Sequence, residues 1–226
     1  MSLAGTFTVT LRVVDGSKMP IVRADAALFW DVKDGLMTMR ANKASVTDDA
    51  GKVVLQVDDW NENRPVLVLT ADRTLGGIVG VSRTNDGQEM TAQLRPTARV
   101  KGKLECRDLK SKPEWANTTV STEGFRGFFA QNISTSGEFE FVLPVGKYSL
   151  ASYGKDVEDV KQTLSLVLDR SEYDLGPADM KASPIAKLKG KTPPGWTITD
   201  ARGVKSSVKL SDYKGKWVYV EFWGFW

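Results

Sequence analysis

Hydrophobic and polar residues alternate with a period of two along most of this chain. In residues 6–13 the odd positions are apolar and the even positions are polar, and similar alternation runs through residues 22–32 and 53–57. This period is typical of strands that bury one face. Residues 66–69 are apolar throughout, which favours a strand that is covered on both faces. No window shows the period of a helix, so we expect residues 1–95 to form an all-β module.

A second series of strands is predicted from residue 96 onward. The first of these strands has an apolar face that comprises Ala98, Val100, Gly102, Leu104 and Cys106. Strand patterns follow in residues 139–143, 148–150 and 164–168, with turn signals between them. Short strands that are separated by turns at this spacing predict a β-sandwich. We therefore expect a second sandwich over residues 96–182.

The composition changes after residue 182. Residues 183–226 carry eight basic and three acidic side chains, although the net charge of the whole chain is only +3. Such an asymmetry indicates a boundary between modules. The segment is also too short to build an ordinary domain core by itself. The predicted fold is all-β, with two antiparallel β-sandwich modules at residues 1–95 and 96–182 and a separate segment at residues 183–226.

The composition excludes several classes of chemistry. The chain has no histidine and a single cysteine, Cys106. It therefore lacks the residues for a zinc site built on histidine, a Ser-His-Asp triad, an intrachain disulfide or a CxxC pair. We expect no catalytic residue, no metal site and no cofactor. The net charge is too small to predict binding to nucleic acid, and no apolar run approaches the about 20 residues of a transmembrane helix.

Part of the second module resembles a known β-sandwich family. Residues 137–148 contain Gly-Glu-Phe-Glu-Phe, followed after one residue by Leu-Pro-Val-Gly-Lys-Tyr. This stretch resembles the hairpin of carboxypeptidase-regulatory-like (transthyretin-like) domains, and residues 100–104 resemble that family's first strand. The resemblance implies a core that contains Phe139, Phe141 and Tyr148. Residues 5–95 resemble a more divergent copy, with residues 47–53 in the corresponding turn.

The C-terminal segment resembles a different family. Residues 192–203 resemble the opening hairpin of redoxin and TlpA-like thiol-disulfide oxidoreductases. Residues 208–226 are similar to the signature that leads into the CxxC motif of that family, and they end in Phe-Trp-Gly-Phe-Trp. The resemblance implies an incomplete thioredoxin-like segment, made of a hairpin and the first core strand. The nucleophilic cysteine would be the residue after Trp226, at a helix N-terminus that lowers its pKa.

This resemblance implies a function for the longer protein rather than for the chain itself. The chain would be the non-catalytic N-terminal region of an exported thiol-disulfide oxidoreductase of the periplasm or cell envelope. Its sandwiches would be spacer or docking modules, and the partners of the parent protein would be protein thiols and disulfides. Because exchange needs an attacking thiolate and usually a second cysteine, we expect the chain to be inactive. The alternative is a sandwich that binds carbohydrate or a cell-envelope polymer and has no redox role.

The run at residues 217–226 predicts a strand for the centre of a sheet that helices cover. It contains one charged residue and no proline, a combination typical of aggregation-prone segments. We expect this run to be disordered, to pair along a sandwich edge, or to mediate self-association with another copy of the chain.

The candidate site residues each have an ordinary structural interpretation. Cys106 is the candidate nucleophile, but its apolar face predicts a buried and inert thiol. Acidic residues at 48–49 and 58–63 offer oxygen ligands for calcium, although their spacing does not match an EF-hand and such residues are common in turns. The glycines of residues 76–80 do not match a phosphate loop and favour a strand or bulge.

Two further groups are carboxylates and aromatic residues. Glu138 and Glu140 lie two apart on one predicted strand, whereas the paired carboxylates of glycosidases generally come from different elements. The aromatic group comprises Trp115, Phe125, Phe128, Phe129 and Tyr153. These side chains could line a face that binds a sugar or peptide, but aromatic residues at this density more often fill a sandwich core.

Overall fold

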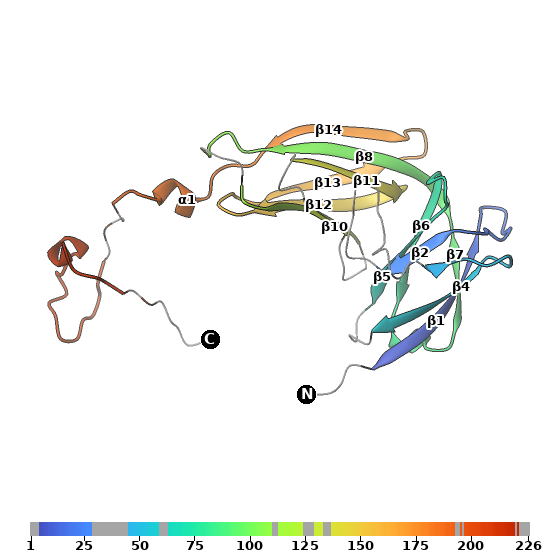
Figure 1. The fold of residues 1–226 in the computed structure, drawn as a ribbon, viewed down its shortest axis with the longest axis horizontal. Helices are drawn as coiled ribbons and strands as arrows, with labels where there is room; N and C mark the ends of the chain where they lie inside the picture. The colour runs from blue at the N-terminus through green and yellow to red at the C-terminus, as the bar shows by residue number, and fades with distance from the viewer. Residues whose placement is uncertain are drawn as a thin grey trace. The chain divides into compact units, whose positions relative to one another are not determined.

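The computed structural model describes residues 5–28, 45–58, 63–109, 113–123, 129–132, 137–192, 195, 197–219 and 221. The chain divides into two compact units, Met1–Ser183 and Pro184–Trp226. Every described strand lies in the first unit, and the described helical segments are short (Figure 1). The protein therefore belongs to the all-β sandwich class, as its alternating pattern predicts.

The described part of the first unit contains fourteen strands in two lobes. The first lobe comprises β1 (Thr6–Val14), β2 (Asp25–Leu28), β3 (Ser45–Val46), β4 (Lys52–Asp58), β5 (Arg64–Leu69), β6 (Leu75–Val81) and β7 (Glu89–Gln93). The second lobe comprises β8 (Arg95–Glu105), β9 (Ala116–Thr122), β10 (Phe129–Asn132), β11 (Glu138–Pro144), β12 (Gly146–Gly154), β13 (Val160–Leu166) and β14 (Glu172–Asp179). Figure 1 shows the second lobe as two layers, with β8 and β14 in one and β12 and β13 in the other.

The two lobes have the same strand topology. In the first lobe β1 pairs antiparallel with β4 and parallel with β7, while β5 lies between β2 and β6. In the second lobe β8 pairs antiparallel with β11 and parallel with β14, while β12 lies between β9 and β13. The short pairs β2–β3 and β9–β10 correspond as well. The second lobe is thus a topological copy of the first.

The lobes are joined through one sheet. At the end of the first lobe β6 pairs with the start of β8, where Leu75 lies opposite Pro96 and Gly76 lies opposite Arg95. This short pairing makes the sheet continuous across the chain position at which the sequence predicts a module boundary. The division into domains at residue 95 stays a prediction.

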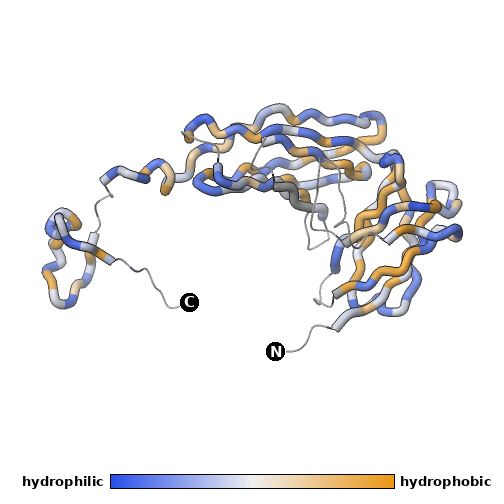
Figure 2. The backbone as a smooth tube through the Cα atoms, viewed as in Figure 1, coloured by the Kyte–Doolittle hydropathy of each residue, from blue (hydrophilic) through white to orange (hydrophobic). Residues whose placement is uncertain are grey.

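Each lobe has its own hydrophobic core. The alternating apolar residues of β1 pack with Val66 and Val68 of β5 in the first core. The second core contains Val100 of β8 and Phe141 of β11, and it also takes in Leu67 and Leu69 of β5. Strand β5 is therefore buried on both faces, as predicted, and its two faces belong to different cores. Figure 2 shows the apolar residues along the strands of both lobes.

The hairpin between β11 and β12 fills the second core as the family resemblance implies. Phe139, Phe141 and Tyr148 are all buried, and the rings of the two phenylalanines lie 6.0 Å apart. The hydroxyl of Tyr148 donates a hydrogen bond to the carbonyl oxygen of Pro144 over 2.6 Å. This bond satisfies the one polar group of the tyrosine and ties β12 to the end of β11.

Equivalent glycines occupy the turns before β4 and β11. Gly51 and Gly137 both have a positive φ, 70° and 77°. The carbonyl oxygen of Gly51 accepts a hydrogen bond from the N–H of Val13, and that of Gly137 accepts one from Leu104, each over 2.7 Å. The turn at residues 47–53 thus occupies the position in the first lobe that the sequence comparison of the two modules predicts.

The structure corrects three strand predictions. Leu168 lies beyond β13 and is 72% exposed, because the chain turns there and the N–H of Arg170 donates to the carbonyl of Val167. The strand expected over residues 22–32 is described only as β2, and Trp30 and Val32 lie outside the described residues. Strands β7, β9 and β14 were not predicted, because few of their residues alternate between apolar and polar.

The described residues of the second unit form no strand. They form a short helix, α1 (Pro184–Leu188), and a 3₁₀ turn, Leu210–Tyr213. The hairpin predicted at residues 192–203 and the start of the strand predicted at 217–226 are therefore not formed in the described part of the unit. Trp217 and Tyr219 are 104% and 87% exposed. A strand of this kind needs a sheet partner for its backbone groups and a cover for both faces.

Candidate functional site

Cys106 is half-buried rather than buried, which corrects the prediction. The residue follows the last position of β8 and packs at the margin of the second core. Burial raises the pKa of the Cys106 thiol, and the carboxylates of Asp108 and Asp179 raise this pKa further. The thiol therefore stays protonated at neutral pH. Because the thiolate is the reactive form, the structure favours the inert thiol that the sequence predicts.

The charged residues around Cys106 hold the end of the sandwich together. Arg107 pairs with Glu105 over 2.9 Å, and Lys181 pairs with Asp179 over 2.6 Å. The N–H of Arg107 donates to Asp179 Oδ1, and this bond together with the Lys181 contact holds the pKa of Asp179 below its usual value. These contacts fasten the loop after β8 to the end of β14. They account for the charges without a catalytic role.

The predicted turn residues have structural roles. Asp48 Oδ1 accepts hydrogen bonds from the N–H groups of Ala50 and Lys52, over 2.9 and 2.8 Å. This arrangement is the Asx-turn that competes with the calcium interpretation. Residues 59–62 lie outside the described residues. Among the residues that the structure describes, no group of three acidic, histidine or cysteine side chains could hold a metal ion.

Residues 76–80 form part of β6, as the strand interpretation predicts. The glycines leave room for neighbouring leucines: a Cβ atom on Gly76 would lie 2.7 Å from Leu69, and one on Gly77 would lie 3.0 Å from Leu94. These glycines therefore serve packing on the two faces of the strand.

Glu138 and Glu140 share the outer face of β11. Glu140 forms an ion pair with Arg99 of the neighbouring strand β8. Both carboxylates lie on one strand, with cross-strand partners Lys103 and Lys101. This arrangement differs from the opposed carboxylates of a glycosidase.

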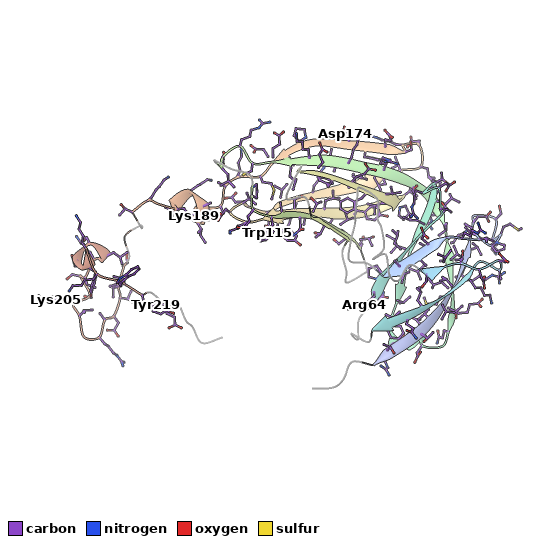
Figure 3. All side chains as sticks on the ribbon, in the orientation of Figure 1. Arg64, Trp115, Asp174, Lys189, Lys205 and Tyr219 are labelled. Atoms are coloured by element: carbon purple, nitrogen blue, oxygen red, sulfur yellow. The ribbon has the colours of Figure 1, made fainter. Side chains whose placement is uncertain are left out.

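Two members of the aromatic group lie together at one end of the second lobe. Trp115 precedes β9, and its ring meets that of Tyr153 of β12 edge-on, with the ring centroids 6.3 Å apart. Trp115 is 41% exposed (Figure 3). Phe125 and Phe128 and the side chain of Phe129 lie outside the described residues. An aromatic pair with one ring in solvent can stack on an apolar ligand surface.

Sequence reasoning missed the sheet face that adjoins this pair. On the outer side of the β10-β9-β12-β13 sheet, Ser149 lies opposite both Ser121 and Thr163, and Ala151 lies opposite Thr119. The signal is present in the sequence as alternating small polar residues at 117–121 and 149–153. The register that unites them could not be read from the chain, because β9 was not predicted as a strand.

Within the described ranges, no helix has the length and apolar character that crossing a membrane requires. The chain matches no known protein family, and no curated protein matches it. The strand pairing and the two cores define the first unit as an all-β sandwich structure.

Several solved structures are similar to the chain. The Bacillus anthracis TIE protein is 12% identical, with a TM-score of 0.35, over 78% of this chain and 34% of that one. A streptococcal ancillary pilin is 12% identical, with a TM-score of 0.34, over 79% of this chain and 63% of that one. The minor pilin GBS52 of Streptococcus agalactiae is 10% identical, with a TM-score of 0.35, over 83% and 99%. The chain thus spans less than two thirds of the first two proteins, and TM-scores this low carry no argument about function.

Proposed function

We propose that this chain is the non-catalytic N-terminal region of a redoxin or TlpA-like thiol-disulfide oxidoreductase of the cell envelope. The observation that carries the proposal is the sequence of residues 208–226, which is similar to the signature that precedes the CxxC motif. The two lobes would be spacer or docking modules of the carboxypeptidase-regulatory-like type. The partners of the parent protein would be protein thiols and disulfides.

The exposure of the second unit supports this proposal. Trp217, Val218 and Tyr219 are exposed apolar residues in a segment whose described residues form no strand. Large apolar side chains are stabilised when they leave water. The thioredoxin-like fold would supply the sheet and helices that cover them. The protonated thiol of Cys106 cannot replace the missing pair of cysteines.

The proposal is tested by the gene and by activity. The codons after Trp226 should encode Cys-x-x-Cys, and a chain that continues through that domain should catalyse insulin reduction by dithiothreitol. The chain of 226 residues should match the rate without protein. A stop codon directly after Trp226 would refute the proposal. Acceleration by the shorter chain that is lost in Cys106→Ser would show that Cys106 is reactive.

A second candidate function is binding of a cell-envelope polymer by the second lobe. The observation that favours it is the exposed ring of Trp115 against Tyr153. Such a ring can stack on the apolar face of a sugar at little cost in side-chain entropy. Trp115→Ala should abolish binding of a polysaccharide to the isolated chain, measured by affinity electrophoresis. This function is compatible with a role as a docking module.

A further inference from the structure

The outer face of the β10-β9-β12-β13 sheet consists mainly of small polar residues. We call it the hydroxyl face and define it by Asn117, Thr119, Ser121, Ser149, Ala151 and Thr163. The register places them together: Tyr153 lies opposite Asn117, Ala151 opposite Thr119, and Ser149 opposite both Ser121 and Thr163. The alternate residues of β12, Tyr148 and Leu150, point into the core. Trp115 and Tyr153 lie at one end of this face.

The two outer faces of the second lobe differ in charge. On the β11-β8-β14 face, Lys101 of β8 lies opposite Glu140 on one side and Asp174 on the other. Such charged pairs are typical of a sheet face that is exposed to water. The six residues of the hydroxyl face carry no charge. Solvent alone does not explain a face that is poor in charge on a lobe whose opposite face is rich in it.

The charges near the hydroxyl face lie around it and have both signs. Lys147 and Lys161 extend from β12 and β13, and both are exposed. Glu123 follows the end of β9, and Asp159 precedes β13. An array of both signs around a neutral centre has no preference for a polyanion or a polycation. The complementary ligand is a polar polymer without charge.

The corresponding face of the first lobe is already an interface. Its sheet contains β5, which is the topological equivalent of β12. The outward residues Leu67 and Leu69 of β5 are buried in the core of the second lobe. The same face of the repeated fold therefore docks in one lobe and is open in the other. In the second lobe it carries hydroxyl groups in place of leucines, so its partner must be polar.

We propose that the hydroxyl face, together with Trp115 and Tyr153, binds a neutral polysaccharide chain. Serine and threonine hydroxyls can both donate and accept hydrogen bonds, as sugar hydroxyls do. The small side chains let a flat polymer approach the sheet, and the aromatic pair stacks on the apolar face of one sugar ring. The proposal rests on the second candidate function, polymer binding, and assigns the surface and the charge of the ligand.

The test uses the full chain and three neutral hexasaccharides: cellohexaose, xylohexaose and chitohexaose. At least one should bind in isothermal titration, with a Kd that is unchanged between low and high salt. Ser149→Arg places a long side chain in the middle of the face and should weaken binding by about tenfold or more. Ser207→Arg adds the same side chain at an exposed position of the second unit and should leave the Kd unchanged.

The outcomes separate the proposal from the function on which it rests. If Trp115→Ala abolishes binding and Ser149→Arg does not, polymer binding stands and the hydroxyl face is refuted as its surface. If none of the three sugars binds the unaltered chain, the proposal is overturned. Tighter binding of polyglutamate, weakened by salt, would assign the face to an acidic peptide and also overturn it. Thr163→Arg repeats the test if circular dichroism shows that Ser149→Arg is unfolded.

Discussion

Gly137 is the residue at which the backbone of the second lobe is most constrained. Its φ is 77°, and a Cβ atom there would lie 2.5 Å from the carbonyl oxygen of Leu104. Gly87 has a similar φ of 71° but open space around the same position. The two glycines thus separate the cost of the backbone conformation from the cost of a close contact.

We expect Gly87→Ala to lower the free energy of unfolding by about 1 kcal/mol, through the positive φ alone. Gly137→Ala should lower it by at least about 1 kcal/mol more, because Leu104 or the turn must move. Urea unfolding of both variants measures the difference. Equal losses would show that the turn relaxes freely around the new methyl group.

Tyr148 makes the stability of the second lobe depend on alkaline pH. Burial raises the pKa of its phenol above the ordinary value of about 10. In the unfolded chain the phenol ionises near that value, whereas in the folded chain it stays protonated. The stabilisation is therefore complete below pH 10 or so and declines as the pH rises beyond it.

Tyr148→Phe should have two effects on urea unfolding. At neutral pH it should remove about 1 kcal/mol, because the hydrogen bond to the Pro144 carbonyl is lost. Above a pH of about 10 the stability of the variant should fall less steeply than that of the unaltered protein. Parallel pH profiles for the two proteins would contradict this assignment.

At the scale of elements, the outer face of β8 is a row of cations between two rows of anions. Lys101 lies opposite Glu140 of β11 and Asp174 of β14. Lys101→Glu would place three carboxylates in one row across the sheet. We expect it to lower the free energy of unfolding by about 1 kcal/mol relative to Lys101→Gln. Added salt should reduce the difference in the denaturation midpoint, because these residues face water. A difference that salt leaves unchanged would indicate a packing effect.

The elements that the sequence predicts are those with a regular apolar face. Strands β1, β4, β5, β8 and β11 alternate or are apolar throughout, and their inward residues are buried. Strand β9 escaped prediction because its inward face includes Thr118, whose hydroxyl pairs with that of Ser152 over 3.0 Å in place of an apolar contact. Strand β14 escaped because its register shifts between Asp174 and Pro177. The hydroxyl face depends on β9, so sequence alone could not assemble it.

The candidate residues divide along the same line. Local chemistry gave the Asx-turn at Asp48 and the β-strand at residues 76–80. The half-burial of Cys106 depends instead on where β8 ends relative to the core, one residue before the thiol. Alternation fixes a face but not the position at which a strand stops.

At the scale of the whole molecule, β5 couples the two lobes. Leu69→Ala should cost about 2–5 kcal/mol, because the side chain is buried in the second core while its strand belongs to the first lobe. Hydrogen exchange should therefore accelerate in both β1 and β12. Val68→Ala, on the opposite face of the same strand, should act mainly on the first lobe. If Leu69→Ala accelerates exchange only in the first lobe, the lobes are energetically independent.

The second unit should be dispensable for the fold of the first. The two units are separately compact, and the exposed apolar residues Trp217, Val218 and Tyr219 all belong to the second. Deleting residues 184–226 should leave the circular dichroism of the sandwiches intact and make the protein more soluble and more monomeric by light scattering. Unfolding of the remaining chain would show that the segment is an integral part of the sandwich fold.

The parallel pairing of the first and last strands in each lobe sets the order in which the protein can mature during synthesis. Thr10 of β1 meets Glu89 of β7, and Arg99 of β8 meets Glu172 of β14. A chain that emerges from the ribosome therefore holds the opening strand of each lobe without its final neighbour until nearly the whole lobe has been made. Contacts between such distant residues form slowly. The outer side of β5 waits longer still, since its cover belongs to the second lobe. Nascent chains of this protein thus expose unpaired strands for most of their translation, which is when chaperones would be needed most.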